Sequence, residues 1–197
     1  KEGEVYVLPI KQILQLQQFD FKSSALNNVR DIFCFMCWTG QRFSDIMSIK
    51  HDDLTKNIND ETVWNLITKK TGDSISVPII TYANEILANH KEGGSPLPNI
   101  SNQKMNEHLK SIGKKIEFDN KVRVVKYFDG RKQETHVPFY EVLTTHVARK
   151  SYITNSLILG IPERVVREVS GHRDEKSFRR YVSLAENYKT SIIKTAY

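Results

Sequence analysis

The chain has 197 residues, of which 39% are hydrophobic and 26% charged, as in an ordinary soluble globular protein. No apolar run approaches the roughly 20 residues that span a bilayer, and no signal-peptide pattern opens the sequence, so we expect no membrane insertion. There are 29 lysines and arginines against 23 acidic residues, and the net charge of +6 at pH 7 suits a polyanionic partner such as nucleic acid. Because the sequence starts at Lys1 rather than at Met, we expect a fragment of a longer protein.

The first predicted elements are three helices. Residues 8–20 form a short helix whose apolar residues at helical spacing are Ile10, Ile13, Leu14 and Phe19. Residues 23–40 begin at a serine N-cap and end at Gly40. Since this segment is apolar nearly all round from Ile32 to Trp38, it is predicted to be the central buried helix. A short helix over 42–49 follows.

Two cysteines, Cys34 and Cys37, form a C-x-x-C inside the predicted central helix. No second Cys or His pair at ligand spacing accompanies them, so we interpret them as buried core thiols rather than as a zinc or redox site. Two reduced thiols without a disulfide framework favour the cytoplasm. The nearest metal-site candidate, His51-Asp52-Asp53, lies in a polar loop and is interpreted as solvated.

The middle of the chain predicts two hairpins and two helices. Residues 61–80 form two strands joined by a turn at 71–73, and residues 121–137 form a second hairpin whose type I′ turn is Asp129-Gly130. Helices are expected over 81–90 and 102–115.

The last third of the chain is helical again. One long helix over 138–160 is ended by Gly160, the next helix has Pro162 at its first position, and Asp174 caps a third over 175–183. These elements predict a single α+β, mainly α, domain that carries a small antiparallel β-sheet.

Several residues have both a structural and a chemical interpretation. His146 and Arg149, at i and i+3 on a helix, share a face and are able to contact one phosphate, although such a pair is also common on surfaces. Arg42 stands at a helix start, where the helix dipole disfavours a cation, so either Asp45 or a bound anion should hold it. Lys70 lies at the tip of the first predicted hairpin. It is either a solvated turn lysine or a proton donor that contacts a substrate, and Lys69 is the competing candidate for the second role.

Taken together, these residues resemble the active-site set of tyrosine recombinases, and the chain is similar to the catalytic domain of a phage- or transposon-type integrase. The motifs are Arg42 in TGQRFSDI, Lys70 in KKTGDSISVPI, His146 and Arg149 in HVAR, His172 in SGHR, and Tyr181 in RRYV. Their order, and the nine-residue step from His172 to Tyr181, are typical of that family. A departure is VSGH, where the family commonly has leucine-glycine-histidine; Gly171 is kept.

The resemblance implies how the phosphate is held. Arg42 and Arg149 would clamp the nonbridging oxygens, because planar guanidinium groups match that geometry. His172 would donate a further hydrogen bond, and Asp45 would orient Arg42. No cofactor and no metal ion is expected, because a covalent protein–DNA bond conserves the phosphodiester energy.

The resemblance also implies the covalent chemistry. Tyr181 would be the nucleophile that forms a 3′-phosphotyrosyl intermediate, with His146 as hydrogen-bond partner or base. Lys70 would protonate the leaving 5′-hydroxyl, with Lys69 as the competing candidate. Among the other tyrosines (Tyr127, Tyr140, Tyr152, Tyr188 and Tyr197), none has both the histidine spacing and a capped helix.

At the level of the molecule, the resemblance implies that residues 1–197 are a catalytic domain whose N-terminal core-binding domain lies outside this sequence. The partner would be double-stranded DNA, bound by a homotetramer whose C-terminal segments, anchored by Ile192 and Ile193, exchange between protomers. A frayed tail, or a helix packed on its own domain, is the alternative. The competing functions are DNA relaxation by a type IB topoisomerase and a non-catalytic DNA-binding module.

Overall fold

The computed structural model describes residues 4–128 and 131–196, with side chains for residues 4–127 and 131–190. Its helices are α1 (Ile10–Gln18), α2 (Ser24–Thr39), α3 (Phe43–Ile46), α4 (Thr81–Asn89), α5 (Asn102–Lys115), α6 (Phe139–Val142), α7 (Thr145–Ile158), α8 (Glu163–Ser170) and α9 (Glu175–Ala196), with a 3-10 turn η1 (His51–Asp53). Its strands are β1 (Leu54–Lys56), β2 (Thr62–Ile67), β3 (Ser74–Pro78), β4 (Lys121–Phe128) and β5 (Arg131–Pro138).

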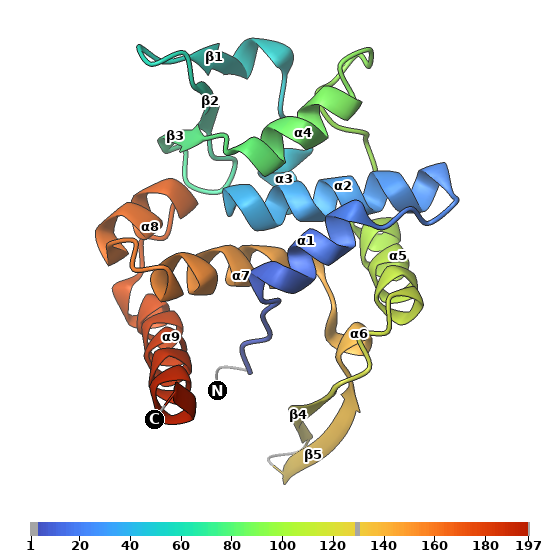
Figure 1. The fold of residues 1–197 in the computed structure, drawn as a ribbon, viewed down its shortest axis with the longest axis vertical. Coiled ribbons are helices and arrows are strands. Elements are labelled where there is room, and N and C mark those ends of the chain that lie inside the picture. The colour runs from blue at the N-terminus through green and yellow to red at the C-terminus, as the bar shows by residue number, and fades with distance from the viewer. Residues whose placement is uncertain (1–3, 129–130, 197) are drawn as a thin grey trace.

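Helix α2 is the centre of the fold, as the sequence predicted (Figure 1). Its residues from Asp31 to Thr39 are all buried, and α1, α4, α5 and α7 pack around it. Cys34 and Cys37 are free thiols inside this core, and burial raises the pKa of both. A helix that is apolar on every side is stable only when other elements cover it on every side, which explains its place here.

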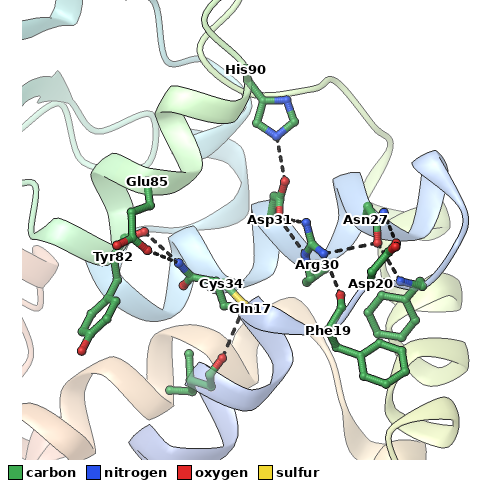
Figure 2. A network of polar contacts seen from close by, with 12 residues as sticks. Gln17, Phe19, Asp20, Asn27, Arg30, Asp31, Cys34, Tyr82, Glu85 and His90 are labelled. Carbon is green, nitrogen blue, oxygen red and sulfur yellow. Dashed lines mark hydrogen bonds and ion pairs between the residues drawn. The ribbon is translucent and has the colours of Figure 1, made fainter.

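A polar network ties the ends of the neighbouring helices to α2 (Figure 2). The carboxylate of Asp31 is only 4% exposed; it accepts a hydrogen bond from Arg30 Nε at 2.8 Å and lies 3.0 Å from Nε2 of His90, at the end of α4. Arg30 also donates to the carbonyl of Phe19 at 2.6 Å. The buried carboxylate is therefore paired on both oxygens, as a buried charge requires.

The strands form two separate antiparallel sheets. The first has the order β1-β2-β3, and the strand β1 was not predicted. The second is the β4–β5 hairpin, which keeps an unbroken register from Lys121↔Pro138 to Phe128↔Arg131. This hairpin confirms the predicted one, while its predicted turn residues, Asp129 and Gly130, lie outside the described residues. The mainly α architecture with small antiparallel sheets is thus the predicted fold class.

Some predicted boundaries were wrong. The long helix expected over 138–160 breaks at Leu143, which is extended (φ −69°, ψ 116°), so that α6 and α7 are separate. Pro162 is the N-cap of α8 rather than its first residue. Phe19 is 39% exposed, whereas Leu16, which the periodicity did not single out, is fully buried.

The C-terminal part of the domain has its own small core between α7, α8 and α9. Its buried members are Ile153, Leu157, Val166, Phe178, Tyr181 and Ala185. Asp174 caps α9 as predicted, because its carboxylate accepts hydrogen bonds from the backbone N–H groups of Lys176 and Ser177. Beyond the predicted end at residue 183, α9 continues as one helix to Ala196. The side chains of Ile192 and Ile193 are not among those described.

Candidate active site

All six residues singled out from the sequence line one cavity of about 480 Å³. They come from the start of α3, the β2–β3 turn, the first turns of α7, the α8–α9 loop and the first turns of α9. The cavity is lined by Arg42, Lys70, Thr71, His146, Arg149, Lys150, Gly171, His172, Arg173, Asp174, Ser177 and Tyr181. Positive charge dominates this lining, so the cavity is suited to an anion.

Arg42 is held from two sides. It is the N-cap of α3, and its Nη2 donates a hydrogen bond to the carbonyl of Gly171 at 3.3 Å. The carboxylate of Asp45, which is 1% exposed, lies 3.8 Å from Nη1 and accepts a hydrogen bond from the backbone N–H of Lys69 at 3.0 Å. Asp45 therefore connects Arg42 to the β2–β3 turn.

Arg149 has a matching anchor. Its Nη1 donates a hydrogen bond to the carbonyl of Gly40 at 2.8 Å. Burial and the nearby Arg42 lower its pKa to about 10, so the guanidinium stays protonated at neutral pH. Each arginine thus donates one N–H group to a carbonyl at a helix end, and its other N–H groups are available to a ligand in the cavity.

Gly40 and Gly171 are left-handed C-caps of α2 and α8, with φ of 69° and 62°. This conformation is easy only for glycine. A Cβ at Gly171 would lie 2.6 Å from Cδ1 of Ile75, and one at Gly40 would overlap the ring of Tyr152. Close packing and backbone geometry both require glycine at the two carbonyls that hold the arginines.

The break between α6 and α7 decides where His146 lies. Since α7 begins at Thr145, His146 is in its first turn, and its side chain is exposed. Partial burial and the cations Lys150, Arg149 and Lys70 lower its pKa below the ordinary value near 6.5. The imidazole is therefore neutral at neutral pH and able to accept a proton.

His172 lies between the two arginines and α9. Its Nε2 is 3.1 Å from the hydroxyl of Ser177, and its ring meets Tyr181 edge to face, with centroids 5.8 Å apart. Burial, followed by Arg149 and Arg42, lowers its pKa to about 4. Within the described residues its buried Nδ1 has no hydrogen-bond partner, which leaves this atom for a ligand.

The β2–β3 turn carries the lysine candidates. Lys70 lines the cavity and Lys69 does not, although the backbone of Lys69 is the part bonded to Asp45. Both lie past the end of β2, in the turn itself. Asp73 in the same turn is paired with Arg173, whose Nε donates to Oδ2 at 2.9 Å. This pair connects the turn to the loop of His172.

Tyr181 lines the cavity and is also a core residue. Its side chain is 8% exposed and packs on Phe178, with ring centroids 5.8 Å apart. No other tyrosine is among the cavity-lining residues: Tyr152 packs on Gly40, Tyr188 is 46% exposed farther along α9, and Tyr127 is on the second hairpin. Tyr197 lies outside the described residues.

Sequence reasoning missed several contributors. Ser177, Lys150 and Thr71 line the cavity without having been singled out. Ser177 alone carried a local signal, because it stands three residues after the predicted cap Asp174. Among the other arginines near Tyr181 in the sequence, Arg173 pairs with Asp73, Arg179 pairs with Glu175, and Arg180 lies over the Tyr181 ring at 5.9 Å.

Two negative findings concern other functions. In the described ranges, no group of three or more His, Cys, Asp and Glu side chains is arranged to hold a metal ion. His51 contacts the carbonyl of Gly93 at 3.2 Å, and Asp53 accepts from the backbone of Lys50 at 2.9 Å. None of the helices in the part of the chain that the structure describes is long and apolar enough to cross a membrane.

Comparison with known families agrees with this arrangement. The profile of the Phage integrase family matches residues 7–188. The chain belongs to the phage integrase family. No curated protein matches its sequence.

Solved structures of similar fold are tyrosine recombinases of low sequence identity. XerA recombinase is 16% identical with a TM-score of 0.66, over 97% of this chain and 66% of that one. XerH recombinase in a post-cleavage complex is 12% identical with a TM-score of 0.65, over 96% of this chain and 52% of that one. The lambda integrase catalytic core is 18% identical with a TM-score of 0.59, over 86% of this chain and 94% of that one. This phage integrase chain therefore has the fold of that catalytic core and spans 52% to 66% of the two longer recombinases.

Proposed function

We propose that this protein breaks and rejoins duplex DNA at specific sites, as an integrase that moves a mobile element through a 3′-phosphotyrosyl intermediate. The observation that carries the proposal is the convergence of Arg42, Lys70, His146, Arg149, His172 and Tyr181 on one cavity. Family membership supports it independently, because the match to residues 7–188 includes every one of these positions.

The first part of the mechanism is phosphate binding. Arg42 and Arg149 place their remaining N–H groups on the nonbridging oxygens, where negative charge grows as phosphorus becomes five-coordinate. The Nδ1 atom of His172 donates a third hydrogen bond when Nε2 accepts from Ser177. These donors are already in place, so little reorganisation opposes the reaction.

The second part is transesterification. The phenolic oxygen of Tyr181 bonds to phosphorus as its proton passes to neutral His146, and the bond from phosphorus to the 5′-oxygen breaks. Lys70 gives its proton to that 5′-oxygen, so that charge and protons balance. Attack by the 5′-hydroxyl of another strand reverses these steps and rejoins the DNA.

We also propose that residues 1–197 serve as the catalytic domain of a larger recombinase, which acts without a cofactor and in the cytoplasm. Coverage of 94% of the lambda integrase catalytic core supports this assignment. Lambda integrase has been solved as a tetramer bound to a Holliday junction, and a homotetramer on DNA is our proposal here. The continuous helix α9, which extends past Tyr181 to Ala196, is the segment we propose to exchange between protomers.

The decisive experiment is covalent trapping on a nicked duplex that carries the recombination site of the element. The wild-type protein should form a protein–DNA adduct in EDTA, since Tyr181 and not a metal-bound water attacks. Tyr152→Phe is the matched control: this tyrosine lies on α7, outside the cavity lining, and its variant should keep the adduct.

The outcomes separate the competing functions. An adduct that persists in Tyr181→Phe would contradict the assignment of the nucleophile. Salt-dependent DNA binding without any adduct would indicate a binding module. Relaxation of supercoiled plasmid by the monomer without site preference would indicate a topoisomerase.

A further inference from the structure

The β4–β5 hairpin projects from the domain, at the end opposite the three-stranded sheet (Figure 1). We call residues 121–138 the ribbon. None of its described side chains is buried, although the two strands pair over their whole length. A two-stranded hairpin has little stability of its own in water. An ordered ribbon with no buried side chain therefore contributes little to the hydrophobic core, and the part beyond its base is open to a partner.

Contacts at its base fix the direction of the ribbon. The hydroxyl of Tyr6 donates to the carbonyl of Arg123 at 2.8 Å, and the backbone N–H of Phe139 donates to the carbonyl of Asn120 at 2.9 Å. Val122 packs against the main core. The ribbon continues through α6 directly into α7, which carries His146 and Arg149. Its base is thus attached to the same helix that lines the cavity.

The ribbon is basic, with five lysines and arginines against two carboxylates. On one face Glu134 neutralises two of the cations, lying 2.8 Å from Nε of Arg123 and 3.2 Å from Nζ of Lys132. Residues directly opposite each other in an antiparallel pair share a face, and so do residues two apart along a strand. The pairs Lys126↔Gln133 and Phe128↔Arg131 therefore place Lys126 and Arg131 together on the other face.

Lys126 and Arg131 form no ion pair within the described residues, unlike Arg123 and Lys132 on the opposite face. Two exposed cations on the same face of a paired strand ribbon suit a polyanion, which carries a row of negative charges, better than a single small ion. Because a two-stranded ribbon also fits the major groove of B-DNA, the charge and the shape favour the same partner.

We propose that the Lys126–Arg131 face of the ribbon binds the phosphate backbone of duplex DNA, as a second contact outside the cavity. The inference rests on the proposed function, in which duplex DNA is the substrate. The ribbon contacts additional phosphates of a duplex whose scissile phosphate lies in the cavity. Its contribution is sequence-independent, because phosphate contacts position a protein without reading bases.

The test is the salt dependence of binding to a fluorescent duplex of about three helical turns, roughly 30 base pairs of arbitrary sequence. The double variant Lys126→Ala/Arg131→Ala should bind more weakly, with the slope of log K against log salt reduced by about two, one for each phosphate contact. The charge-matched control is Lys56→Ala/Lys91→Ala, on the side of the three-stranded sheet and α4. It should leave the slope unchanged.

Each result decides one question. If wild-type protein fails to bind the duplex, the proposed function fails with the ribbon. If wild type binds and the ribbon variant keeps its slope, only the ribbon inference is overturned. An unchanged slope together with an altered oligomeric state would assign the ribbon to a second copy of this chain instead. Because both side chains are exposed, the variant should keep its melting temperature, which a thermal scan checks.

Discussion

At the scale of single residues, the surroundings of the two histidines set their charge. Desolvation by partial burial, followed by the neighbouring cations, lowers the pKa of both. The histidines differ in exposure: His146 is exposed in the first turn of α7, whereas His172 is half-buried beside Ser177. This difference suits His146 to proton transfer and His172 to a fixed hydrogen bond.

The acid limb of the pH profile tests the role of His146. As a base it must be neutral, so adduct formation should persist as the pH falls through 6.5 and decline only near its lowered pKa. When the rate is measured with subsaturating DNA, the acid limb reports the pKa of this group in the free enzyme. In His146→Gln the rate should be lower and this limb should be absent, because His172 donates from Nδ1 whether it is neutral or protonated. A wild-type midpoint above 6.5 would exclude His146 as this base.

At the scale of elements, two helix ends determine where the arginines point. The carbonyls of Gly40 and Gly171 close α2 and α8, and each is an acceptor for one guanidinium. Helix C-termini concentrate unsatisfied carbonyls and partial negative charge, so they hold cations well. The sequence identified Gly40 as a cap from its position, but not the arginine 109 residues away that uses it.

Replacing either glycine by alanine should affect both stability and chemistry. A left-handed alanine costs about 1–2 kcal/mol, and contact with Ile75 or Tyr152 adds to this. Gly171→Ala and Gly40→Ala should therefore lower the melting temperature and slow adduct formation. Gly72→Ala is the control: its φ is also 69°, but no atom lies within 4 Å of the added Cβ. Similar losses in all three variants would argue against the packing explanation.

Some elements were predicted correctly from the sequence and others were not. Local signals located α2, the start of α9 and the β4–β5 hairpin, because an apolar segment, a cap residue and turn-forming residues act within a few positions. The break between α6 and α7 was not visible, since Thr144 makes no side-chain cap bond and the backbone N–H of Thr145 is instead bonded to Asn106. That bond depends on tertiary packing.

The candidate site shows the same division. Family resemblance selected six residues that the fold brings to one cavity. It did not select Arg173 and Asp73, which pair across 100 positions, or Ser177, whose role depends on the ring of His172. Pairings of this kind arise only when separate elements meet, so no local pattern marks them.

At the scale of the whole molecule, α2 holds the parts together. It packs against α1, α4, α5 and α7, and the Asp31 network joins it to the end of α4 and to the chain before it (Figure 2). The three-stranded sheet and the ribbon lie at opposite ends of this framework (Figure 1).

Removing one partner of the network should destabilise the framework without touching the cavity. Asp31→Ala leaves the nearly buried guanidinium of Arg30 unpaired, which should lower the free energy of unfolding by about 3 kcal/mol. Urea denaturation measures this loss. The exposed pair Lys56–Asp60 supplies the control, because Asp60→Ala should cost less than about 1 kcal/mol. Equal losses of unfolding free energy in the two variants would indicate that the buried network stabilises the protein no more than an exposed ion pair does.

Each arginine is bonded to a carbonyl far away in the sequence, and this also determines when the cavity becomes complete. Arg42 is held by a carbonyl 129 positions later in the chain, and Arg149 by one 109 positions earlier. During synthesis, Arg42 lacks its anchor until α8 has emerged and folded, and Tyr181 on α9 emerges later still. The cavity that we propose to act on DNA is therefore complete only in the finished domain.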